Sequence, residues 1–135
     1  MVKFTRSMNF SIDLYFQIIS LLIVVFFYIK KGNKLLMYFV PFLFVTVSVE
    51  LFGWWYLSKG VRNYVMYNLF TTIEFLFYSF LFYVHFKKSF LKKIILIFIP
   101  FFVFVVVLNM TFIQGLNKTF NTYTFLLGSF FIVIF

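Results

Sequence analysis

The apolar residues of this chain lie in five long blocks, and the charged residues lie between the blocks. The blocks cover about residues 11–29, 35–57, 64–86, 94–113 and 119–135. The first four have roughly the 20 residues that an α-helix needs to cross about 30 Å of hydrocarbon. Backbone groups in lipid must form their hydrogen bonds within the segment, so each block predicts a helix. The predicted fold class is therefore all-α: a multipass transmembrane bundle of about five helices, with sequence neighbours packed antiparallel across short loops.

The composition excludes a soluble protein. Hydrophobic residues make up 64% of the 135 residues and charged residues 11%, which leaves too little polar surface for a small soluble domain. A transmembrane barrel would show short segments of alternating polarity, which these blocks do not. We expect one membrane-embedded domain over residues 1–135. Because the last block is still apolar at Phe135 with no basic residue after it, we also expect this chain to be the N-terminal part of a longer protein.

The charge is strongly basic, with 12 Lys and Arg against three acids and a net charge of +9. These bases are confined to short hydrophilic segments, which favours anionic lipid headgroups over nucleic acid as their partner. The segments 30–34 and 87–93 carry seven of them and the other hydrophilic segments carry five. The positive-inside rule then predicts that these two loops are cytoplasmic and that the N-terminus lies outside. An excess of Lys over Arg with abundant Phe is typical of an AT-rich bacterial genome, which predicts the cell (inner) membrane as the location.

The three acids, Asp13, Glu50 and Glu74, all fall within apolar blocks. At 1.5 Å per residue, Glu50 lies about 10 Å from the outer end of its predicted helix and Glu74 about 15 Å into the next. Because these two helices are expected to be antiparallel, the two glutamates would lie at similar depth and could face each other. A charge at the centre of a helix in lipid costs about 2.5–3.5 kcal/mol. We therefore expect the pair to hold a proton or a cation.

Polar residues also share helix faces. In the third block they follow spacings of 3, 4, 3, 4 and 7 within an arc of about 80°, and they comprise Tyr64, Tyr67, Thr71, Glu74, Tyr78 and His85. Thr46, Glu50 and Trp54 share a face of the second helix, and Asp13, Gln17 and Ser20 share one of the first. If the three faces meet, they enclose a small polar cavity. Its predicted site residues are Glu50, Glu74, Tyr67, Thr71, Tyr78, Thr46 and Trp54, with Asp13, Gln17, Tyr64 and Asn68 at the rim.

Two alternatives stand beside this cavity. Hydroxyl and amide side chains also join helices in lipid, through hydrogen bonds worth about 0.6–2 kcal/mol each, without any ligand. Trp54 fits the interfacial aromatic belt better than the cavity, because it lies at a helix end. A further pattern favours the cavity, because most polar residues of the apolar blocks fall toward the side that holds the N-terminus. They are Asp13, Gln17, Glu50, Tyr64, Tyr67, Asn68, Thr71, Asn109, Asn121, Thr122 and Thr124. This uneven distribution predicts a cavity open to one face of the membrane only.

Three functions follow from these predictions. The first is a non-enzymatic membrane sensor or binding module with its polar site around the two glutamates. The second is a proton- or cation-coupled transporter or transporter subunit, for which five helices would have to be completed by homo-oligomerisation or by further C-terminal helices. The third is a membrane-embedded lipid enzyme that uses the two carboxylates. The chain has one His, no Cys and none of the common hydrolytic or nucleotide-binding motifs, so we predict no catalytic residue, metal site or cofactor.

Overall fold

The structure of the chain is a computed structural model that describes residues 12–134, apart from the side chain of Asp13. Five α-helices and one π-helix account for most of these residues, and no strand occurs among them. The helices are α1 (Ile12–Lys31), α2 (Lys34–Ser58), α3 (Tyr64–His85), α4 (Ser89–Leu108), the π-helix η1 (Asn109–Ile113) and α5 (Thr122–Ile134). The predicted all-α class with about five helices is confirmed.

Four helical segments are long and apolar enough to cross a membrane, namely Leu14–Lys31, Lys34–Ser58, Tyr64–His85 and Ser89–Ile113. Helix α5 has 13 residues in the described part of the chain, which corresponds to about 20 Å at the standard helical rise. That is shorter than the hydrocarbon thickness of about 30 Å. The protein is therefore a membrane protein by the length and composition of four helices.

The helix boundaries differ from the predicted ones mainly in the second half of the chain. Helix α4 begins at Ser89, before the predicted start at residue 94, because Lys92 and Lys93 join its first turns instead of the loop. Their long side chains can reach water from an interfacial turn. The fifth helix begins at Thr122 instead of residue 119. The residues before it form an ordered connection whose backbone groups bond to side chains of other elements.

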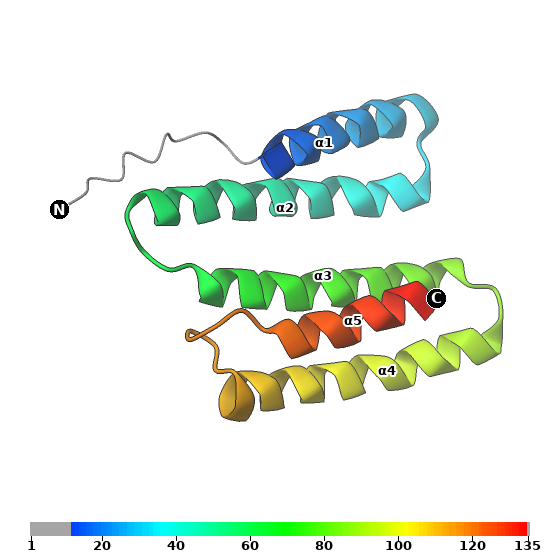
Figure 1. Cartoon of the computed structure of the whole chain (residues 1–135). Helices are drawn as coiled ribbons and strands as arrows, with labels where there is room; N and C mark the ends of the chain where they lie inside the picture. The colour runs from blue at the N-terminus through cyan, green and yellow to red at the C-terminus, as the bar shows by residue number, and fades with distance from the viewer. Residues whose placement is uncertain (1–11, 135) are drawn as a thin grey trace. The chain divides into compact units, whose positions relative to one another are not determined.

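The chain divides into two compact units, Met1–Arg62 and Asn63–Phe135. Unit 1 contains α1 and α2, which pack side by side and antiparallel (Figure 1). Gly32, at φ 58°, makes the tight connection between them, and the Asn33 side chain accepts a hydrogen bond of 3.0 Å from Leu35 N to cap α2. The predicted single domain would include both units, and it stays a prediction.

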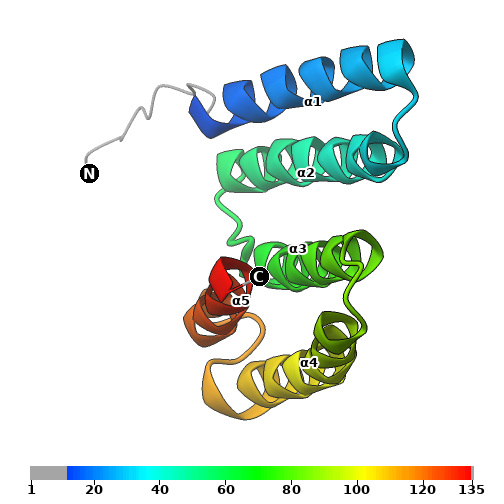
Figure 2. The same cartoon turned by 90° about the vertical axis from the view of Figure 1, so that its right-hand side faces the viewer.

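Unit 2 contains α3, α4 and α5, and each of these helices contacts the other two. Helix α4 runs antiparallel to α3, and α5 returns alongside both, so the three axes form a triangle when viewed along them (Figures 1 and 2). The core consists of Phe75, Phe102 and Val106, with exposed fractions of 4%, 0% and 4%. Gly128 of α5 lies directly on the ring of Phe75, because a Cβ at this position would come within 2.5 Å of it. The absent side chain is what lets α5 approach α3 this closely.

The two ends of unit 2 differ in polarity. The α3–α4 end carries Lys87, Lys88, Lys92 and Lys93, a set that we call the lysine end. Three of these lysines are exposed and Lys92 is half-buried, with its Nζ 5.2 Å from the centre of the Tyr83 ring. The opposite end holds the α4–α5 connection and a group of buried amide side chains. The candidate functional site lies at this second end.

Candidate functional site

Asn68, in the second turn of α3, is fully buried, with an exposed fraction of 0%. Its Nδ2 donates hydrogen bonds to the carbonyl oxygens of Leu116 (3.0 Å) and Thr119 (2.9 Å), and its Oδ1 accepts one of 2.9 Å from Asn121 N. One side chain of α3 thus binds three backbone groups of the α4–α5 connection. Hydrogen bonds to a buried amide fix this connection over the end of the helix.

A second buried amide, Asn109, begins the π-helix η1 at the end of α4. Its Nδ2 donates to Gln114 Oε1 (2.8 Å) and to Thr124 Oγ1 (3.0 Å). Gln114 Oε1 also accepts a hydrogen bond of 3.3 Å from Tyr123 N, in the first turn of α5. The Gln114 side chain therefore caps α5 as an N-cap side chain would. It does so although Gln114 lies seven residues before Asn121, the residue that precedes α5. We call Asn68, Asn109, Gln114, Asn121 and Thr124 together the amide end.

The amide end has hydrogen-bonding capacity to spare. Asn109 Oδ1 and both polar side-chain atoms of Asn121, Oδ1 and Nδ2, are buried without a hydrogen-bond partner in the described structure. Asn121 directly precedes α5, yet its side chain does not cap the helix because Gln114 occupies that position. Buried polar atoms usually have partners, and π-helices are frequent at functional sites. These two features make the amide end a candidate for binding a polar group.

The predicted polar residues of α3 fall on two adjoining faces. Thr71 and Ser79 are buried together with Phe75 on the face that packs within unit 2, and Ser79 Oγ donates to Phe75 O at 2.8 Å. Tyr64, Tyr67, Glu74 and Tyr78 are half-buried and lie to one side of this face. Asn68, predicted at the rim, belongs to the buried face. The polar stripe of α3 thus extends from the amide end to the middle of the helix.

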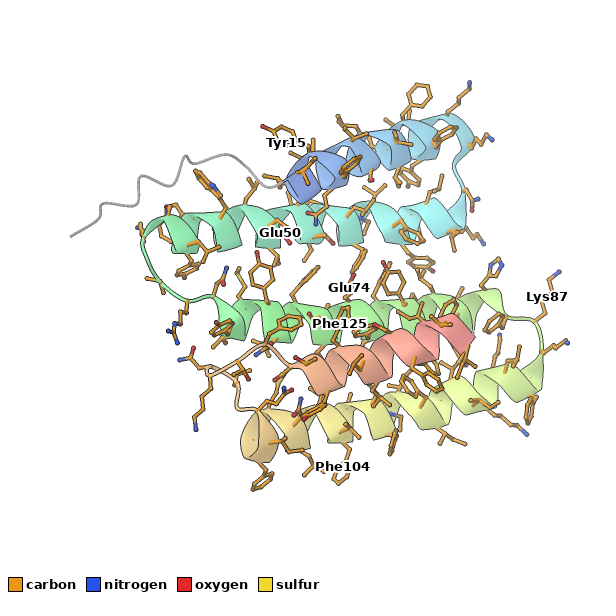
Figure 3. The ribbon with its side chains drawn as sticks, in the orientation of Figure 1. Tyr15, Glu50, Glu74, Lys87, Phe104 and Phe125 are labelled. Atoms are coloured by element: carbon orange, nitrogen blue, oxygen red, sulfur yellow. The ribbon has the colours of Figure 1, made fainter. Side chains whose placement is uncertain are left out.

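Glu74 lies at the centre of this stripe, ten residues after the first residue of α3 and eleven before the last. Tyr78 lies one turn further along and interacts electrostatically with the Glu74 carboxyl group. Figure 3 shows Glu74 on the middle turns of α3, far from Lys87 at the lysine end. In the described residues, no three His, Asp or Glu side chains come together in a way that would hold a metal ion.

The predicted residues of unit 1 lie on its two helices. Glu50 and Trp54 are half-buried on α2, one turn apart (Figure 3 labels Glu50). Thr46 Oγ1 donates to Phe42 O at 3.0 Å, so its hydroxyl is satisfied within its own helix. On α1, Gln17 is half-buried, and the side chain of Asp13 is outside the described part of the structure. Glu50 belongs to unit 1 and Glu74 to unit 2, and their pairing stays a prediction.

Sequence reasoning missed Gln114 altogether, because it lies in a segment expected to be an ordinary hydrophilic loop. It singled out Asn109, Asn121 and Thr124 only because of their predicted depth in the membrane. Their one available signal was the accumulation of amide residues around the end of the fourth block. Nothing in the spacing of Asn68 and Asn121 indicates that they contact each other.

No protein family, curated protein or solved structure matches this chain. No relative therefore supplies an activity.

Proposed function

We propose that the protein is a non-enzymatic membrane sensor or binding module whose polar site is formed around its intramembrane glutamates. In unit 2 the proposed site residues are Glu74, with Tyr67, Thr71 and Tyr78 on the same helix. In unit 1 they are Glu50, with Thr46 and Trp54. We further propose that it resides in a bacterial cell membrane with its N-terminus outside.

The observation that carries the proposal is the depth of Glu74. It lies about 15 Å from either end of α3 at the standard helical rise, and α3 contains no Lys or Arg. An ionised carboxylate at this depth costs about 2.5–3.5 kcal/mol even on the lenient scale. A glutamate that is kept there holds a proton or a cation, and either state can respond to conditions outside the membrane. Intramembrane acids commonly mark such sites.

The amide end supports the same proposal from within unit 2. Asn68 and Thr71 extend the polar stripe of α3 from Glu74 to the buried amides, about two turns away. Asn109 Oδ1 and the Asn121 amide add acceptors and a donor that the described residues leave without partners. Such hydrogen-bonding side chains can bind water or a polar ligand that moves toward the Glu74 carboxyl group.

The test uses the whole protein, purified in a zwitterionic detergent and compared with Glu74→Gln, which keeps the shape of the side chain and removes its charge. Infrared difference spectra recorded across pH should show the C=O band of a protonated carboxyl group, and Glu74→Gln should lose it. Thermal unfolding in NaCl, KCl and choline chloride tests the cation instead. If neither the carboxyl band nor a cation-specific shift in Tm distinguishes the two proteins, the proposal fails.

The transporter alternative is separated by a flux measurement. The protein is reconstituted in vesicles that contain a pH-sensitive dye, and a pH gradient is imposed with and without Na⁺ or K⁺. A binding module leaves the gradient intact, whereas a transporter dissipates it in a manner that Glu74→Gln abolishes. Flux that depends on Glu74 would replace the binding module by the transporter.

A further inference from the structure

The lysine end and the segment 30–34 both join the C-terminus of one helix to the N-terminus of the next. They differ in how many lysines lie at the N-terminus: one in the segment 30–34, which is Lys34, and three at the lysine end. Lys30 and Lys31 occupy the last turn of α1, where the partial negative charge of a helix C-terminus stabilises cations. Their Nζ atoms also lie 5.9 Å and 5.6 Å from the ring centres of Phe26 and Phe27. These two lysines therefore have compensation within their own helix.

In unit 2, Lys87 follows the C-terminus of α3, whereas the other three lysines lie at the N-terminus of α4. Lys88 is the N-cap residue of α4, it makes no side-chain capping bond, and Lys92 and Lys93 follow in the first turns. The N-terminus of a helix carries a partial positive charge and has unpaired N–H groups, so cations there are destabilising. With Lys87, four positive charges gather within seven residues beside this terminus. An anion bound beside this terminus would offset these charges.

The surface beside these lysines is apolar. Phe90, which lies between them, is 72% exposed, and Leu96 and Ile97 continue an exposed apolar face along α4 with exposed fractions of 53% and 70%. Further along the helix, Phe104 points away from the other helices of unit 2 (Figure 3). Positive charges at one end of an apolar helix face match the headgroup and the acyl chains of a single lipid molecule.

We propose that the lysine end binds the headgroup phosphate of an anionic phospholipid, whose acyl chains lie along the exposed apolar face of α4. The negative phosphate offsets both the repulsion among the four lysines and the unfavourable helix terminus. This inference does not depend on the proposed role of Glu74. It singles out one of the basic segments as a lipid site, while the others serve as ordinary topology anchors.

The test measures how much phosphatidylglycerol stabilises the full chain in zwitterionic detergent, with phosphatidylcholine and inorganic phosphate as the other additions. The variant K87Q/K88Q/K92Q/K93Q is compared with the control K30Q/K31Q, which removes charge only from the compensated terminus. We expect phosphatidylglycerol to raise the Tm of the parent and of the control and to leave the Tm of the quadruple variant nearly unchanged. Phosphatidylcholine and free phosphate should have little effect on any of them.

Two further variants cover poor folding of the quadruple variant. K87Q/K88Q and K92Q/K93Q should each lose part of the shift, and the four-Arg variant at the same positions should keep it. The proposal is overturned if the quadruple variant responds as the parent does, or if the control loses as much of the shift as the quadruple variant. An equal shift from phosphatidylcholine or from inorganic phosphate would also overturn it, because the site would then not select an anionic lipid.

Discussion

At the amide end of unit 2, buried side chains bond to the backbone of the 114–121 connection, whereas at the lysine end the connection between α3 and α4 is short and its charged side chains are mostly exposed. The first arrangement is directional, since Asn68 has three backbone partners in defined positions. The second relies on helix packing, and its charges interact with the surroundings. Unit 2 thus stabilises one end with buried hydrogen bonds and leaves most of the charged side chains of its other end exposed.

The largest effect is expected from Asn68→Leu. The substitution removes three hydrogen bonds, of which the one from Asn121 N is buried and those to Leu116 O and Thr119 O are partly buried. Leaving such groups unsatisfied costs about 1–3 kcal/mol each, although relaxation of the connection recovers part of it. We expect a loss of about 3 kcal/mol in the free energy of unfolding, measured in detergent, and faster tryptic cleavage at Lys118.

Thr72→Val is a matched control for Asn68→Leu, because its hydroxyl donates only to Asn68 O in its own helix at 3.0 Å. It should cost far less and leave cleavage at Lys118 unchanged. Equal losses in the two variants would show that the hydrogen bonds to the connection do not distinguish the amide end.

The second-largest effect is expected from Gly128→Ala, which tests the packing of α5 against α3 between the two ends. The new methyl group would lie 2.5 Å from the Phe75 ring, and that ring is held by Phe102 and Phe125 at centroid distances of 5.8 Å and 5.9 Å. Overpacking of this kind costs about 1–3 kcal/mol. The thermal midpoint should fall, and adding Phe75→Leu should recover part of the loss. A Gly128→Ala protein with the parent midpoint would refute the close approach of α5 to α3.

A smaller effect is expected from Gln114→Ala. The side chain accepts from Asn109 Nδ2 and from Tyr123 N, so its removal leaves the start of α5 without this cap. Loss of a cap costs about 1 kcal/mol. Amide hydrogen exchange should accelerate in the first turn of α5 and stay unchanged in α3 near His85. Asn117→Ala, in the exposed part of the same connection, is the control and should alter neither quantity.

The smallest effect is expected from Lys87→Gln in zwitterionic detergent. The side chain is exposed at the lysine end, and substitutions at such positions change the free energy of unfolding by less than about 0.5 kcal/mol. Equilibrium unfolding of the variant and the parent should therefore coincide. A loss as large as that of Asn68→Leu would mean that the lysine end also stabilises the unit internally.

The sequence was sufficient to predict the helices because the physical signal is local. Apolar blocks bounded by lysines specify α1, α2 and α3 to within a few residues, and Gly32 with Asn33 specifies the first connection. The burial of Asn68 could not be predicted, because its partners are backbone carbonyl and N–H groups, which nearly any residue supplies. The π-helix at Asn109 and the capping by Gln114 depend on how α4 and α5 meet. The shared site of Glu50 and Glu74 depends on the arrangement of the two units and remains a prediction.

The hydrogen bonds of Asn68 also have a consequence for biosynthesis. Its partners lie 48 to 53 residues later in the chain, so a ribosome completes α3 well before any of them emerges. During that interval the amide group has to stay near the aqueous boundary or pair with water in the insertion channel. The Asn68 side chain therefore gains its partners only after the connection between α4 and α5 has been made, which makes arrival of this connection a late step in the assembly of this half of the protein.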